Sequence, residues 1–396
     1  MGSYSILIGL SIAVILSYLF DVIARATKVP SVLMLLLTGI ALRQSADYFG
    51  FSLGIPTVVL EIFGIIGLIM IVLEGSLDLK LTRNKAPLIR RSFLAAALML
   101  VVQAVAIALL LQAYVGASFQ SCLANAVPLS VISSAIAIPS VANLLGEKQE
   151  FIVYESTFSD ILGIMLFNFA LQDNFARGIS VVTFSLDVVA VAVVAVVSTA
   201  ALAFLLGRIR LHVKFFLILA FLVLLYSLAK QLHLSSLVLV LVFGLAVNNA
   251  DLILRGPRLQ RWLHPEQLAA ELHLLKSITA ESAFLIRTFF FLLFGFSITL
   301  SSLVSGPLLL QGVLIVAVLT GIRYLYLRHV ARIDLVPELF IAPKGLITVL
   351  LFYSIPEEHR IGEVGENILF LVILLTGLLM MIGLQLANRE PEIGEY

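Results

Sequence analysis

The residues best suited to chemistry lie in one short run, ESTFSD at positions 155–160. In a helix, Ser156 and Asp160 lie one turn apart, as do Glu155 and Ser159, so hydroxyls and carboxylates occupy neighbouring parts of one face. A polar helix start explains Glu155, but Asp160 is followed directly by an apolar stretch. A carboxyl group in such a setting is costly to bury and marks a functional site, where it can hold a proton or a small cation. We therefore expect Asp160 to be the central functional residue.

Two proline-containing stretches interrupt apolar segments, SSAIAIP at 133–139 and APKG at 342–345. Proline has no N–H, so it frees a carbonyl one turn earlier and kinks or breaks the helix. Freed carbonyls beside a carboxylate form the oxygen-rich site that Na⁺ or K⁺ prefers. The expected ion-binding set is Asp160, the hydroxyls of Ser156 and Ser159, and the carbonyls of Ala135 and Ile138. Two broken helices in corresponding places of two halves are typical of transporters built from an inverted repeat.

Two basic residues also lie inside apolar segments, Arg323 and Lys344. Arg323 is expected at the same depth as Glu155, so the two can form a structural ion pair that leaves Asp160 as the unpaired titrating group. The alternative for Arg323 is a side chain that extends to the lipid headgroups. Lys344 and the end of the helix in span five (123–145) are expected to offset the opposing helix dipoles where the two interrupted helices cross.

Composition indicates the class of protein that must position these residues. Of the 396 residues, 61% are hydrophobic and 12% are charged, and the mean hydropathy is +1.11. A soluble domain of this size needs a more charged surface. A net charge of +1 gives no case for a nucleic-acid partner. The single cysteine, Cys122, excludes a disulfide framework and a cysteine metal cluster. We expect an all-α, multi-pass protein of the lipid bilayer, and the composition leaves a transporter, a channel or an enzyme whose active site lies in the membrane as the classes to decide between.

Thirteen transmembrane helices are expected, because about 20 apolar residues cross a bilayer and unpaired backbone groups are costly in lipid. The expected spans are residues 4–24, 29–45, 55–79, 91–114, 123–145, 151–172, 180–206, 213–231, 233–249, 277–300, 304–326, 335–354 and 364–387. Eighteen of the 25 Lys and Arg residues fall on one side, four on the other and three inside spans. The N-terminus is therefore expected outside and the C-terminus in the cytoplasm. The loop at 250–276 is expected to be an interfacial amphipathic stretch, and no soluble domain is expected.

The chain resembles the monovalent cation:proton antiporter superfamily, which includes the sodium/proton exchangers of bacteria and animals. VP at 29–30 with TG at 38–39, and GLIMIVLEGSLD at 67–78, resemble its second and third helices. The run at 155–160 is similar to the Glu-Ser-x-x-Asn-Asp motif of the electroneutral branch. Arg323 and the APKG stretch resemble the arginine and the later Gly-x-Arg-Gly of that branch.

The chain also departs from the electroneutral pattern in two places. Ser159 stands where that branch has asparagine and the electrogenic branch has a second aspartate. The stretch at 133–139 is closer to the Ser-Ser-Thr-Ala pattern of the other branch. Unlike several potassium-efflux relatives, the chain is not expected to carry a nucleotide-binding domain after its last span.

The resemblance implies a homodimer with a single transmembrane exchanger domain. Residues 1–79 and 213–300 would form a dimerisation scaffold, residues 91–172 and 304–387 an ion-transporting core, and residues 180–206 a linker helix. It further implies electroneutral exchange of Na⁺, or else K⁺ or Li⁺, for H⁺ by alternating access, with Asp160 as the metal ligand and proton site. Such exchange needs no enzyme chemistry and no cofactor, so neither is expected. The expected location is the cell membrane, as the inner membrane of a bacterium.

A second class of function is a sodium-coupled symporter of a small organic anion, which can share crossed broken helices. Such a protein would need a substrate pocket with further polar groups in its core spans. Few polar residues lie in those spans, which favours an ion over an organic solute.

Overall fold

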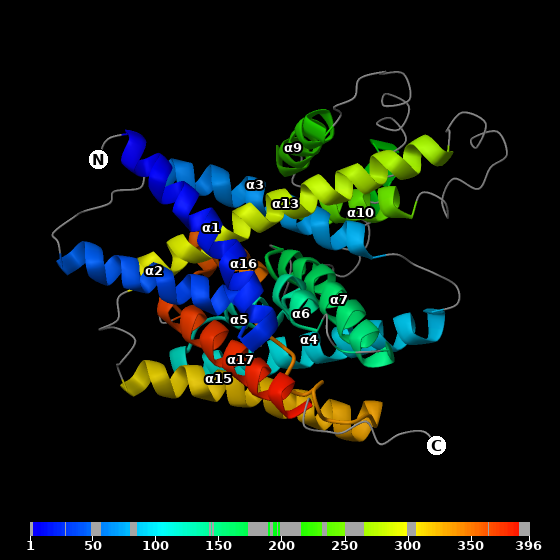
Figure 1. Ribbon diagram of the computed structural model, residues 1–396. Coiled ribbons are helices and arrows are strands. Elements are labelled where there is room, and N and C mark those ends of the chain that lie inside the picture. The colour runs from blue at the N-terminus through cyan, green and yellow to red at the C-terminus, as the bar shows by residue number, and fades with distance from the viewer. Residues whose placement is uncertain are drawn as a thin grey trace, which may run out of the picture. The chain divides into compact units, whose positions relative to one another are not determined.

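The structure is a computed structural model, and its described residues form helices joined by turns, without β-strands (Figure 1). It describes residues 3–27, 29–48, 57–79, 85–141, 144, 146–172, 189–190, 193–195, 197–198, 215–231, 236–249, 265–298, 306–362 and 364–387. The helices are α1 (Ser3–Thr27), α2 (Ser31–Tyr48), α3 (Thr57–Asp78), α4 (Ala86–Val115), α5 (Phe119–Ser130), α6 (Ser134–Ser140), α7 (Gly146–Ala170), α9 (Phe215–Gln231), α10 (Ser236–Asn248), α13 (Pro265–Ser297), α15 (Gly306–Leu325), η3 (Tyr326–Ala331), α16 (Leu346–Tyr353), η4 (Glu357–His359) and α17 (Glu366–Ala387). The expectation of an all-helical protein is confirmed for this part of the chain.

Six helical segments among the described residues are long and apolar enough to cross a membrane. They are Leu7–Ala24, Ala86–Val115, Phe119–Ser140, His273–Ser297, Gly306–Ala331 and Glu366–Ala387. Helices suit this role because all their backbone N–H and C=O groups can pair within the segment, which lipid demands. The chain is therefore a multi-pass membrane protein.

Every expected span except one overlaps a described helix. The exception, 180–206, lies largely outside the described residues. For the eighth and ninth expected spans, α9 ends at Gln231 and α10 begins at Ser236, and residues 232–235 lie outside the described residues. The expected loop at 250–276 is wrong in its second half, because α13 already begins at Pro265 and continues into the span.

The helix expected at 123–145 is interrupted, but not where the sequence indicated. Pro128 lies inside α5 and Pro139 lies inside α6, whereas residues 131–133 between the two helices are extended. Val131 and Ile132 are β-branched and Ser133 competes for backbone hydrogen bonds, so this stretch has low helix propensity. A proline removes one N–H without ending these helices.

The second interruption lies where it was expected. Residues 341–345 are not helical, between a turn at 336–340 and the start of α16 at Leu346. The two interruptions touch, because the Ser133 N–H donates to the Pro343 carbonyl at 2.9 Å. A Cβ at Gly345 would collide with the Ser133 side chain, so only glycine allows this close approach.

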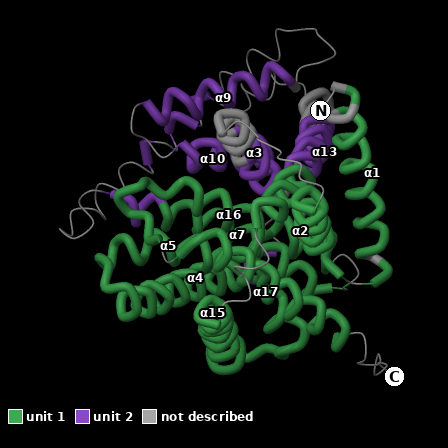
Figure 2. The backbone as a smooth tube through the Cα atoms, turned by 90° about the vertical axis from the view of Figure 1, so that its left-hand side faces the viewer, with its two compact units in different colours: residues 1–56, 88–167, 287–396 green, residues 57–87, 168–286 purple. Residues whose placement is uncertain are grey.

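The chain divides into two compact units, coloured in Figure 2. Unit 1 comprises Met1–Pro56, Leu88–Phe167 and Arg287–Tyr396, and unit 2 comprises Thr57–Pro87 and Asn168–Ile286. In unit 1, α15 packs along α17 and α16 packs against α5. In unit 2, α3 packs along α10, where Gly244 faces Ser76. Residues 1–56 thus share a unit with most of residues 91–172 and 304–387.

Candidate ion-binding site

The polar run at 155–160 lies on α7 and is buried. Relative exposure is 1% for Glu155, 1% for Ser156, 2% for Ser159 and 6% for Asp160. Ser159 and Asp160 contact the interruption between α5 and α6, while Glu155 contacts α15. One helix therefore carries two carboxylates with different partners, both within unit 1.

Asp160 lies against the first residue of α6. Its Oδ2 accepts a hydrogen bond from the Ser134 N–H at 3.2 Å. The first N–H groups of a helix have no partner inside the helix and carry partial positive charge, so they stabilise a nearby anion. The expectation that Asp160 is unpaired is therefore wrong, because its partner is a backbone amide that sequence reasoning could not assign.

The interruption is held by three successive backbone amides, each of which finds an acceptor elsewhere in unit 1. Ile132 N–H donates to Ser159 Oγ at 2.9 Å, Ser133 N–H to Pro343 O, and Ser134 N–H to Asp160. Each such group would cost several kcal/mol if it were left unpaired in lipid. The extended conformation at 131–133 is thus maintained by α7 and by the second interruption.

The other expected ligands lie nearby but in different settings. Ser156 Oγ donates to the Val153 carbonyl of its own helix at 3.2 Å. Ala135 and Ile138 lie inside α6 rather than at the interruption, and the Ile138 carbonyl accepts from the Val141 N–H at 3.3 Å. Their role as ligands stays a prediction. Sequence reasoning passed over Ser133, whose buried Oγ has no hydrogen-bond partner among the described residues.

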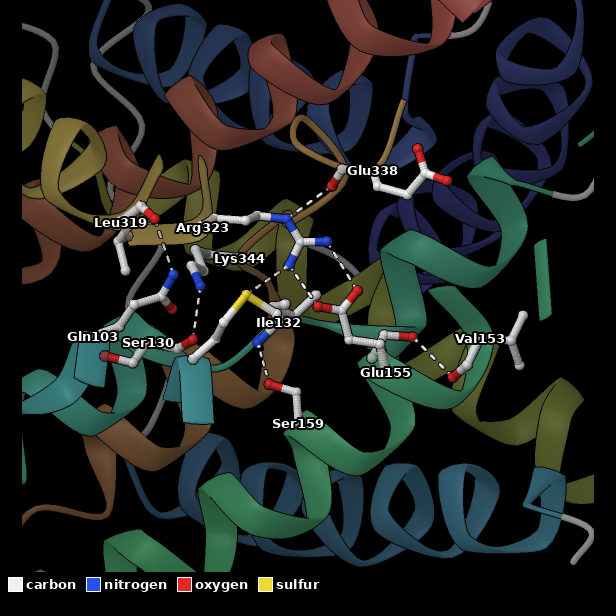
Figure 3. Close-up of polar contacts among 12 residues, drawn as sticks. Gln103, Ser130, Ile132, Val153, Glu155, Ser159, Leu319, Arg323, Glu338 and Lys344 are labelled. Atoms are coloured by element: carbon white, nitrogen blue, oxygen red, sulfur yellow. Dashed lines mark hydrogen bonds and ion pairs between the residues drawn. The ribbon is translucent and has the colours of Figure 1, made fainter. Parts of the chain in front are cut away.

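Arg323 and Glu155 form a buried, bidentate ion pair (Figure 3). Arg323 Nη1 donates to Glu155 Oε1 at 2.6 Å, and Nη2 donates to Oε2 at 2.9 Å. Arg323 Nε donates to the Glu338 main-chain carbonyl at 2.8 Å. Each side chain of the pair is 1% exposed. An arginine that reached for the headgroups would keep its head in water, so this alternative is excluded for the described conformation.

Lys344 lies at the second interruption and is 1% exposed. Its Nζ donates to the Ser130 carbonyl at 2.8 Å, at the C-terminal end of α5 (Figure 3). Its backbone N–H donates to Thr376 Oγ1 at 3.1 Å. A positive charge near the last carbonyls of a helix complements the negative end of the helix dipole.

Glu338 is a buried acid that sequence reasoning missed. It lies in the turn at 336–340 and is 3% exposed. The signal was present, since Glu338 falls inside the expected span 335–354. Gln103 is a second buried polar residue beside the ion pair, and its Nε2 donates to the Leu319 carbonyl at 2.9 Å. Among the described residues, no group of three His, Cys, Asp or Glu side chains could hold a metal ion.

The fold is similar to that of solved antiporter structures. A structure of the sodium proton antiporter MjNhaP1 from Methanocaldococcus jannaschii at pH 8 matches with a TM-score of 0.69 and 19% identity, covering 96% of this chain and 100% of that chain. An electron-microscopy structure of the same antiporter matches with a TM-score of 0.66 and 18% identity, covering 100% of both chains. A search of curated protein sequences gives no match.

The family follows from the sequence itself. The family model described as sodium/hydrogen exchanger, transmembrane, matches residues 10–387, which is nearly the whole chain. The match includes the carboxylates of α7, the arginine of α15 and both interruptions. Members of such a family are transporters rather than enzymes. The chain belongs to the sodium/hydrogen exchanger family.

Proposed function

We propose that this protein is a secondary active antiporter that exchanges a monovalent cation for H⁺ at Asp160. Na⁺ is the first candidate for this cation, and K⁺ and Li⁺ are the alternatives. The observation that carries the proposal is the position of Asp160, a buried carboxyl group that contacts the Ser134 amide where α5 and α6 are interrupted. Intramembrane carboxyl groups beside interrupted helices are typical of ion sites in transporters.

Competition for one carboxyl group is sufficient for obligatory exchange. Asp160 binds a proton or a cation but not both, and the core moves only when the site is loaded. The cation replaces its lost water with oxygen ligands, for which we propose Asp160, Ser156, Ser159 and the carbonyls of Ala135 and Ile138. Pro139 supports a role for Ala135, because a proline has no N–H to pair with the carbonyl four residues earlier.

Exchange is proposed to be electroneutral. Arg323 neutralises Glu155 through two short hydrogen bonds, and Ser159 does not titrate in the working range. Only Asp160 then changes charge during the cycle, so one proton exchanges for one cation. Lys344 supports the closely packed interruptions by binding the end of α5.

The finer architecture belongs to the same proposal. Thirteen spans would cross the membrane from an outside N-terminus to a cytoplasmic C-terminus, with spans five and twelve as the crossing helices of an inverted repeat. Residues 1–79 and 213–300 would form the scaffold of a homodimer, and residues 91–172 and 304–387 the moving core, in the inner membrane of a bacterium. The non-helical stretches at 131–133 and 341–345, joined by the Ser133–Pro343 hydrogen bond, support this crossing.

The decisive experiment measures proton movement in proteoliposomes that are given an inward gradient of Na⁺, Li⁺ or K⁺. Wild type should move protons against at least one of these cations, and Asp160→Asn should lose this exchange while remaining folded. Glu147→Gln is the matched control, because this acid lies at the start of the same helix and its side chain is 71% exposed. A folded Asp160→Asn variant that exchanges normally would end the mechanism. Cation uptake that depends on an organic anion and moves no protons would favour a symporter.

A further inference from the structure

Helix α15 and the π-helix η3 that follows it carry an apolar surface that ends in basic residues. α15 lies at the edge of unit 1 in both views (Figure 1, Figure 2). In the spanning segment Gly306–Ala331, only 28% of the apolar stretch is buried in the protein, against 83% in Phe119–Ser140. Leu310 is 70% exposed and Val313 is 53% exposed. Most of this segment therefore faces the lipid.

Three basic residues end this surface, Arg328 and His329 within η3 and Arg332 directly after it. All three are exposed, whereas Leu327 is buried and holds η3 against the rest of unit 1. Arg328 and Arg332 are four residues apart, about one helical turn, so they lie on one side of the segment. In the part of the chain that the structure describes, none of the three side chains forms a hydrogen bond or an ion pair.

The acid closest in sequence does not neutralise these arginines. Asp334 contacts Lys148 instead, at 3.5 Å. Two guanidinium groups are thus left at the end of a span without a carboxylate among the described residues. A guanidinium group is a strong ligand for phosphate, because two parallel N–H groups match two phosphate oxygens.

The surroundings favour a phospholipid over a free phosphate ion. Tyr324, Leu325 and Val330 lie beside the arginines and are 41%, 56% and 62% exposed. A free phosphate ion binds the arginines but leaves these apolar side chains uncovered. A phospholipid meets both needs, since its phosphodiester group binds guanidinium and its acyl chains cover the apolar surface of α15.

We propose that Arg328 and Arg332, with His329 as a further donor, bind the headgroup of an anionic phospholipid whose acyl chains lie along α15. In the proposed orientation, this site faces the cytoplasmic leaflet, which carries anionic lipid. η3 follows the turn of α15 that holds Arg323, so a bound headgroup steadies the segment that anchors the ion pair with Glu155. The inference goes beyond the proposed exchange activity and does not depend on it.

The test is the thermal unfolding of purified, delipidated protein in detergent, with phosphatidylglycerol, phosphatidylcholine or inorganic phosphate added. Phosphatidylglycerol should raise the unfolding temperature of wild type more than phosphatidylcholine does, and inorganic phosphate should have little effect. Each arginine near an anionic headgroup strengthens binding about fivefold, so Arg328→Gln should raise the half-saturating concentration of phosphatidylglycerol about fivefold. Lys230→Gln is the matched control, because this exposed lysine is an isolated charge in the last turn of α9. It should keep the wild-type response.

Arg332→Gly separates loss of binding from loss of folding. Arg332 has a φ of 52°, in the left-handed region where a Cβ is costly and glycine is at ease. Without added lipid, this variant should therefore unfold at or above the wild-type temperature, yet it should need about fivefold more phosphatidylglycerol. An unchanged half-saturating concentration in both arginine variants would overturn the proposal. Equal stabilisation by the two lipids would also overturn it, and so would equal stabilisation by inorganic phosphate and phosphatidylglycerol.

Discussion

Removing Arg323 should destabilise the protein more than any surface substitution, because it leaves Glu155 buried and charged. In Arg323→Met, the apolar side chain fills similar space but donates no hydrogen bond. Glu155 then loses the bonds of 2.6 and 2.9 Å while its side chain stays 1% exposed. Breaking a buried pair in this way costs about 3–5 kcal/mol. The Glu338 carbonyl also loses its Arg323 donor, so the upper part of this range is expected.

The double variant distinguishes an ion pair from simple loss of packing. Glu155→Gln with Arg323→Met removes both charges, and neutral replacements of a buried pair often cost little. We therefore expect the double variant to be more stable than Arg323→Met alone. In a double-mutant cycle, this difference appears as a coupling energy between the two side chains.

The assay is denaturant unfolding of the purified protein in detergent at one fixed pH. Arg91→Met is the matched control, because the Arg91–Glu147 pair is 3.6 Å apart with side chains 39% and 71% exposed. Exposed pairs contribute about 0–1 kcal/mol, so this variant should stay close to wild type. The reasoning is refuted if Arg323→Met is no less stable than Arg91→Met. It is also refuted if the free energy of unfolding of the double variant falls by the sum of the losses in Glu155→Gln and Arg323→Met.

Two further predictions follow from the same charges. Lys344→Met removes the donor that binds the Ser130 carbonyl, and it should lower the free energy of unfolding by about 1.5–3 kcal/mol. Lys230→Met, at an exposed lysine in the last turn of α9, should have little effect, and equal stability of the two variants would contradict a supporting role for Lys344. Exchange of Na⁺ or Li⁺ for protons should proceed at the same rate with and without a membrane potential set by K⁺ and valinomycin. A rate that follows the imposed voltage would reject the cycle with one carboxyl group.

The sequence predicted the fold class and the family because those depend on patterns along the chain. Apolar segments of spanning length located the helices, and opposite chain directions placed Arg323 and Glu155 at one depth, where the structure joins them. Asp160 stood out because an apolar stretch follows it. Each of these inferences needs only local hydropathy and the alternation of spans across a membrane.

The position of the first interruption could not be predicted in the same way. Pro139 indicated a break, yet the chain stays helical through it and becomes extended at 131–133. The chain is interrupted here because backbone N–H groups at 132–134 find hydrogen-bond acceptors outside their own helix. These acceptors lie on α7 and at Pro343, which are distant in sequence. Glu338 was overlooked although it falls inside the expected span 335–354, and the structure shows that its side chain is buried.

In the proposed cycle, the interruption allows one carboxyl group to serve two cargoes. The Ser134 N–H needs an acceptor in every state, and a carboxyl oxygen can accept a hydrogen bond whether Asp160 is ionised or protonated. The amides of Ile132 and Ser133 are bound by a hydroxyl and a carbonyl, neither of which titrates in the working range. In the proposed cycle, exchange of a proton for a cation therefore leaves all three contacts that hold the backbone in place. The same backbone conformation would then carry either cargo, as the proposed single-site exchange requires.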